Sequence, residues 1–137
     1  MADSSDVSAG VNATATQYNN LRKDVVLGQL VQGTETYAAT TDIDFTSLIR
    51  GKVRTVTLTG NTIFTFTGAV AGQVLYLRIV QDATGSRTVT WPSGIKWPGG
   101  VAPTLSTTAN KIDTICILCT ATGPVAYDAG LVFSSLS

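Results

Sequence analysis

Through most of the chain, hydrophobic and polar residues alternate with the two-residue period of a half-buried β-strand. In the segment 52–58, Val56 and Leu58 share one face and the intervening threonines share the other. The segment 62–67 repeats this alternation. The segment 73–81 carries apolar residues on both faces, which is typical of a more central strand. The pattern therefore predicts a β-rich domain.

The remaining segments extend this β pattern. The segment 111–119 is apolar on both faces and is also predicted to be central. Gly60-Asn61 is typical of a hairpin turn. No internal repeat indicates a solenoid. We therefore expect an all-β fold, an antiparallel β-sandwich or jelly-roll-like domain of seven or eight strands. The other predicted strands are 34–40, 43–48, 87–91 and 125–133.

A different pattern precedes the strands. Residues 1–13 are small and polar and predict a flexible arm. Thr14 and Gln17 fit a capping box, which predicts a short helix over 15–27 that ends at Gly28. This helix has too narrow an apolar stripe to be stable alone, so it must dock on its own domain or on a neighbour. The residues at helical spacing that would make this contact are Tyr18, Leu21 and Val25.

The chain therefore divides into two parts. Residues 1–28 are the arm and helix, an anchor or oligomer contact, and residues 29–137 are the β-sandwich domain. At 137 residues, the chain is long enough to bury one core.

The charge content narrows the classes of partner that the protein could bind. Only 13% of the residues are charged and the formal net charge is zero, which favours association and disfavours binding to nucleic acid. No apolar run reaches the ~20 residues of a membrane span, and the N-terminus lacks the pattern of a signal peptide. We expect contacts with protein rather than with nucleic acid or membrane.

Catalysis is not expected. The chain has no histidine, the commonest general base and metal ligand, and no phosphate-binding or dinucleotide motif. Asp42 and Asp44 share one strand face and could form a carboxylate pair, although an exposed polar edge is the commoner explanation. We expect a protein that is not an enzyme and that uses no cofactor.

The two cysteines are expected to be small buried hydrophobes. Cys116 and Cys119 lie three apart in a predicted strand, about 10 Å from each other and on opposite faces. A disulfide requires Cα atoms within about 7 Å, so the two should not pair. No further ligand cluster indicates a metal site.

Basic residues gather around one predicted strand. Arg50, Lys52 and Arg54 alternate onto one face and could contact phosphates. Because the net charge is zero, a solvated or interface-pairing strand face is the favoured interpretation.

Both tryptophans precede prolines. Proline cannot donate to a strand ladder, so Pro92 and Pro98 should each end a strand pairing and start a rigid turn. Trp91 continues an inward alternation and is expected in the core. Trp97 is less constrained. It could stack on a sugar, fill a neighbouring subunit's pocket or cover its own loop, and sugar is the weaker choice because no acids or amides flank it in the sequence.

Several motifs support a family resemblance. "TGSRTVTWP" is followed by "WPGG", then "PTL" and "TANKID", within residues 59–118. This block resembles the β module at the ends of tailed-phage tail fibres, and "TATQYNNLRKDV" at 14–25 resembles the N-terminal segments of such proteins. The resemblance implies a non-enzymatic virion component that works as a homo-oligomer.

Two departures from tail fibres shape the functional prediction. The arm leads directly into the β domain without a long stem, and residues 120–137 lack the aromatic-rich ending of the fibre module. These features favour a capsid decoration (cement) protein, a homodimer or homotrimer that binds the major capsid or other virion proteins. A tail-fibre or baseplate component for host attachment is one alternative, and a carbohydrate-binding module is another. The expected location is the virion, assembled in the host cytoplasm.

Overall fold

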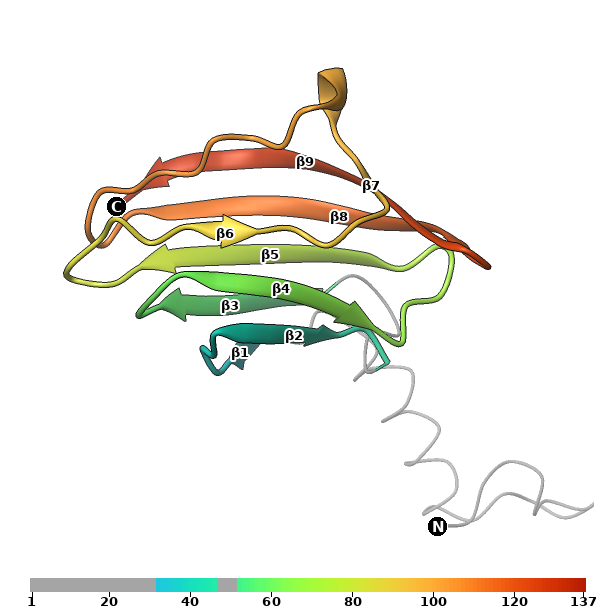
Figure 1. Ribbon diagram of the computed structural model, residues 1–137, viewed down its shortest axis with the longest axis horizontal. Helices are drawn as coiled ribbons and strands as arrows, with labels where there is room; N and C mark the ends of the chain where they lie inside the picture. The colour runs from blue at the N-terminus through green and yellow to red at the C-terminus, as the bar shows by residue number, and fades with distance from the viewer. Residues whose placement is uncertain (1–31, 47–51) are drawn as a thin grey trace, which may run out of the picture.

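The computed structural model describes residues 32–46 and 52–137 (Figure 1). The predicted arm and helix over 1–28 lie outside these residues. The described part is built from nine strands and one short 3-10 turn, η2 (Pro98–Gly100). The prediction of an all-β fold is confirmed for this part of the chain. The strands are β1 (Gln32–Glu35), β2 (Thr40–Asp44), β3 (Lys52–Leu58), β4 (Thr62–Thr67), β5 (Val74–Gln81), β6 (Val89–Thr90), β7 (Ile95–Lys96), β8 (Ile112–Thr122) and β9 (Val125–Leu136).

The strands form two sheets that share one core. The larger sheet has six strands in the order β1-β3-β5-β8-β9-β7, and the smaller has three in the order β2-β4-β6. In Figure 1, β2, β4 and β6 overlie the larger sheet. Buried side chains from both sheets belong to one hydrophobic cluster, which places the core between the two layers.

The first six strands alternate between the two sheets. β1, β3 and β5 pair in parallel in the larger sheet, while β2, β4 and β6 pair in parallel in the smaller one. Gln32 lies beside Val53, 21 residues later, and Thr40 lies beside Ile63, 23 residues later. This half of the domain is therefore a short parallel coil, in which each turn contributes one strand to each sheet.

The second half is arranged differently. β5 pairs antiparallel with β8, β8 forms an antiparallel hairpin with β9, and β7 runs parallel to β9. Of the seven strand pairings, five are parallel, so the predicted antiparallel, jelly-roll-like pairing is wrong for most of the fold. The hairpin predicted at Gly60-Asn61 is also wrong, because the chain there crosses from one sheet to the other. A turn between two alternating strands looks the same in sequence whether the strands pair or cross between layers.

The inward faces follow the predicted alternation. Val56 and Leu58 of β3 are fully buried, and β5 and β8 lie inside the sheet as predicted. Burial of this much aliphatic and aromatic surface is the main stabilising term of the domain. The buried hydrophobic residues are Ile43, Phe45, Val56, Leu58, Phe64, Leu75, Leu77, Ile79, Ile115, Ile117, Cys119, Tyr127 and Ala129.

Buried threonines hold the corner between successive turns of the coil. The hydroxyls of Thr41 and Thr62 lie 2.9 Å apart, and both donate to the carbonyl oxygen of Ala38, at 2.9 and 2.8 Å. Because both threonines are almost completely buried, these bonds satisfy polar groups that would otherwise destabilise the fold. The crossing between sheets is thereby fixed by side chains as well as by packing.

A buried carboxylate anchors the long segment after η2. Asp113 of β8 accepts hydrogen bonds from the Ser106 backbone N–H at 2.6 Å and hydroxyl at 2.9 Å, and from the Ser135 N–H at 3.0 Å. Leu105, next to this anchor, packs against the core. The segment therefore helps to close the core between the two layers.

Two neighbouring residues of β4 test the assignment of faces. Phe64 is fully buried and Ile63 is 50% exposed. Phe64→Ala should lower the free energy of unfolding by about 3–5 kcal/mol, because it leaves a cavity. Ile63→Ala should cost less than about 1 kcal/mol. Urea denaturation measures both changes, and equal losses would contradict the assignment.

Candidate functional site

The Trp-Pro block forms two turns on the edge of the larger sheet. β6 ends at Thr90 and β7 at Lys96, so each proline follows the first residue after a strand. Gly94 has a φ of 86° and Gly99 a φ of 68°, a left-handed conformation that favours glycine. Because the prolines restrict φ and the glycines permit these turns, the backbone around both indoles is well defined.

A chain of aromatic rings leads from the core to the surface. The ring centroids of Phe64 and Trp91 lie 5.4 Å apart, and those of Trp91 and Trp97 lie 5.1 Å apart in an edge-to-face arrangement. Both indoles are half-buried and pack against the core cluster. An edge-to-face aromatic pair is stabilised by more than the burial of its surface, so Trp91 holds Trp97 in place.

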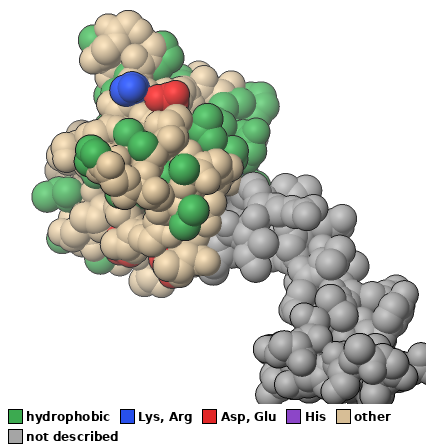
Figure 2. All heavy atoms as spheres, turned by 90° about the vertical axis from the view of Figure 1, so that its right-hand side faces the viewer, with side chains coloured by type: hydrophobic (Ala, Val, Ile, Leu, Met, Phe, Trp, Pro, Cys, Tyr) green, Lys and Arg blue, Asp and Glu red, His purple; other side chains and the backbone are tan. Residues whose placement is uncertain are grey.

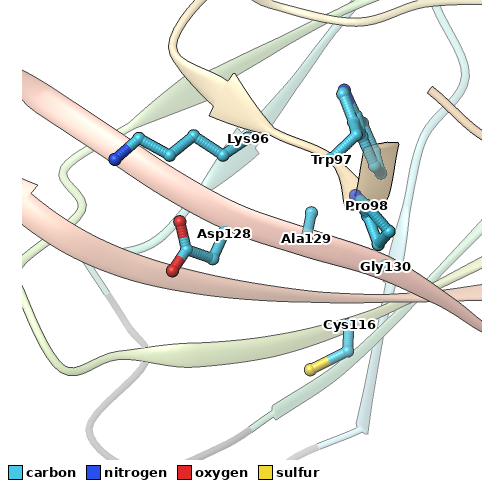
Figure 3. A pocket seen from close by; sticks show the side chains of 7 residues that line it. All are labelled: Lys96, Trp97, Pro98, Cys116, Asp128, Ala129 and Gly130. Atoms are coloured by element: carbon cyan, nitrogen blue, oxygen red, sulfur yellow. The ribbon is translucent and has the colours of Figure 1, made fainter. Parts of the chain in front are cut away.

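A hollow of about 400 Å³ lies beside Trp97. It forms because β7 pairs with β9 only at Tyr127 and Asp128, so the next residues of β9 have β8 on one side and no strand among the described residues on the other. Figure 3 shows the lining side chains. They come from the Trp-Pro block and from β8 and β9: Lys96, Trp97, Pro98, Cys116, Asp128, Ala129 and Gly130.

Two opposite charges border the hollow. Lys96 and Asp128 are partners in the parallel pairing of β7 with β9, and both are exposed. Within the described part of the chain, neither forms an ion pair within 4.0 Å or a side-chain hydrogen bond. Figure 3 shows the ammonium and carboxylate groups to one side of the indole. The hollow therefore combines an aromatic surface with one free donor group and one free acceptor group.

Asp128 could not be connected with Trp97 from the sequence. The two residues are 31 positions apart, and only the unpredicted parallel pairing of β7 with β9 brings them together. Sequence reasoning found no acid near Trp97 because it considered only neighbours along the chain.

A second surface lies on the outer face of the larger sheet. We call it the apolar patch, and it surrounds a hollow of about 320 Å³. Phe133 is 55% exposed, Leu136 41% and Tyr76 36%. In the described residues, Arg78 is the only charged side chain lining this hollow, and it has no ion pair there. The residues of the apolar patch are Val53, Tyr76, Arg78, Thr114, Phe133 and Leu136.

The predicted basic face is only partly described. Arg54 lies on the same face of β3 as the buried Val56, and its Nε lies 3.3 Å from the Glu35 carboxylate. Its charge is therefore balanced within the chain, which leaves little reason for it to contact phosphate. Lys52 begins β3, and nothing further is described of its side chain. Arg50, Tyr18, Leu21 and Val25 lie outside the described residues.

The two aspartates of β2 are exposed and engaged with threonines. Asp42 accepts hydrogen bonds from the hydroxyls of Thr65 at 2.7 Å and Thr67 at 2.6 Å. Asp44 accepts from the backbone and hydroxyl of Thr46, and these bonds lower the pKa of Asp44. Because both carboxylates are engaged with threonines, Asp42 and Asp44 fit the interpretation of an exposed polar edge better than that of a catalytic carboxylate pair.

Comparison with known protein families identifies the chain. A family model described as "Putative phage tail fibre C-terminal domain" matches residues 14–123. The chain belongs to this family. The resemblance inferred from the Trp-Pro motifs is confirmed, and the domain is a phage virion structural protein. No curated protein and no solved structure matches the chain.

The described part of this tail fibre domain offers few other reactive groups. Cys116 and Cys119 are both free thiols. Cys119 is buried as predicted, and this burial raises its pKa, whereas Cys116 is only partly buried and lines the hollow beside Trp97. No group of three His, Cys, Asp or Glu residues in the described ranges could hold a metal ion. No helix among the described residues is long and apolar enough to cross a membrane.

An ion pair closes the turn that leads to Trp91 in the tail fibre domain. The Arg87 guanidinium lies 2.8 Å from the Asp82 carboxylate, which also accepts the N–H groups of Thr84 and Gly85. The hydrogen bond from Arg87 is the largest effect lowering the pKa of Asp82 below its ordinary 3.8. Gln81 exchanges two hydrogen bonds with the backbone of Arg87, each 2.9 Å long.

The lowered pKa of Asp82 predicts a pH-dependent contribution to stability. The ionised carboxylate should stabilise the fold above pH 3.8, and this stabilisation should be lost as the pH falls through the lower pKa of the folded state. Asp82→Asn should therefore reduce the Tm at pH 7, and the difference from wild type should disappear in strong acid. Asp128→Asn, which removes no ion pair, is the matched control. A Tm difference for Asp82→Asn that does not change with pH would contradict this account.

Proposed function

We propose that this domain is a non-enzymatic component of the phage tail that takes part in attachment to the host. The observation that carries the proposal is the tail fibre family match over residues 14–123. The match favours the tail-fibre alternative over the capsid decoration role. The lack of histidine in the sequence supports a binding role rather than an enzymatic one.

The location of the protein on the virion tests this proposal. Cryo-electron microscopy of virions labelled with an antibody against the domain should place it at the tail, in few copies. An antibody against the major capsid protein provides the control for labelling of the head. Many copies distributed over the head would contradict the proposal and would support a decoration protein instead.

We also propose that the domain works as a homo-oligomer that buries the apolar patch against another copy. The net charge of zero means that copies do not repel one another strongly. Exposed apolar patches on soluble proteins commonly mark interaction sites. Figure 2, which faces the end of the domain at the right in Figure 1 and not the patch itself, shows that charged side chains are few there as well. The low charge of the surface thus supports contact with a second copy.

The size of the sheet is compatible with such an interface. Four long strands about 4.8 Å apart, each roughly nine residues at ~3.3 Å, present a flat area on the order of 600 Å². A standard stable interface buries about 800 Å² on each partner. The edge of β9 beyond the hollow beside Trp97 adds apolar side chains, since Leu131 and Val132 are exposed and do not line that hollow. Face and edge together therefore approach the area that a stable oligomer needs.

A charge placed in the apolar patch tests this interface. Phe133→Lys should dissociate the oligomer, because a solvated ammonium group cannot be buried there without a partner. Ile63→Lys is the matched control, because Ile63 is similarly exposed but lies on the smaller sheet. Light scattering during size-exclusion chromatography measures both masses. A wild-type monomer, in which another part of the same chain could cover the patch, would overturn the proposal, as would equal dissociation of both variants.

A further inference from the structure

We propose that the hollow beside Trp97 binds a neutral pyranose of a bacterial surface polysaccharide. The inference rests on the proposed role in host attachment and adds the ligand class and the residues that recognise it. Trp97 would stack on the apolar face of the sugar ring, while Lys96 and Asp128 would bind its hydroxyl groups.

The indole is a preorganised platform. Trp97 packs edge-to-face on Trp91, which in turn packs on the buried Phe64, so two ring contacts link it to the core. Pro98 restricts the backbone that follows it. A surface that is already rigid loses little conformational entropy when a ligand binds, which favours recognition of a small ring.

The two charged groups suit hydroxyl groups. A lysine ammonium only donates hydrogen bonds and an ionised carboxylate only accepts them, whereas a sugar hydroxyl can do both. Lys96 and Asp128 have no ion pair with each other within 4.0 Å, and no hydrogen bond of either side chain occurs in the described residues. Because the pair carries no net charge, the hollow favours a neutral saccharide over an anionic or cationic one.

Packing against a protein side chain is the competing use of Trp97. Lysine and aspartate are depleted in the cores of protein interfaces, where their desolvation is costly. The apolar patch has one charged side chain, Arg78, among six lining residues, and it fits a protein partner better. The hollow beside Trp97 has two charged lining residues and is open to solvent, so it suits a small polar ligand better than a protein side chain.

This proposal reverses an expectation from the sequence. Sugar binding was the weaker choice for Trp97 because no acid or amide lies near it in the chain. The parallel pairing of β7 with β9 places Asp128 at the same hollow and so removes that objection.

A glycan array tests the proposal with the full chain. The probes are neutral oligosaccharides from bacterial lipopolysaccharides and capsules, as two separate sets, and uronic-acid-containing oligosaccharides as a third set. Wild type should bind at least one neutral probe, and Trp97→Ala should weaken that binding at least tenfold. Asp128→Asn and Lys96→Ala should weaken it several-fold, while Ile63→Ala should leave it unchanged.

Further measurements separate loss of the site from loss of the fold and from failure of the proposed function. Trp97→Phe keeps an aromatic face and should retain part of the binding, with a Tm close to that of wild type. No binding to any neutral probe, or equal binding by Trp97→Ala, would overturn the sugar site. If the protein lies at the tail but the sugar site fails, the attachment role stands. If the protein lies on the head, the attachment role fails whatever the array shows.

Discussion

Burial of one face of each sheet against the other is the constraint on which the rest of the structure depends. Phe64 and Ile43 from the smaller sheet and Leu77 and Ile117 from the larger sheet belong to one cluster that water does not reach. The first six strands meet this demand by alternating between layers. Each crossing needs a corner, and the corner at Ala38 buries the hydroxyls of Thr41 and Thr62 without losing their hydrogen bonds.

The antiparallel strands complete the larger sheet and create both candidate surfaces. β8 and β9 continue the core face of the coil and leave the outer face of the sheet uncovered by described residues, which produces the apolar patch. β7 covers only two residues of β9, which leaves the hollow beside Trp97. The two surfaces differ in their content of charged side chains. The patch suits another copy of the chain, and the hollow suits a small polar ligand.

The sequence predicted which face of a strand is buried better than it predicted which strands pair with each other. Alternation identified the buried side of β3, because burial depends only on the two-residue period of a strand. It could not show that Gly60-Asn61 joins different sheets, since a hairpin and a crossing share the same local pattern. The unrecognised parallel coil is the main error, because turns of 21 and 23 residues with mostly different residues in corresponding positions leave no visible repeat.

The candidate site shows the same limit. The aromatic half of the hollow was evident from the Trp-Pro motifs, whereas Asp128 depended on a long-range pairing that no local pattern reveals. The central claim is that the tail fibre domain contacts the host through this hollow. The most direct measurement is the adsorption rate constant of virions that carry Trp97→Ala, compared with virions that carry Ile63→Ala. The account predicts slower adsorption for Trp97→Ala alone, with normal particle assembly, whereas an unchanged rate for Trp97→Ala would contradict it.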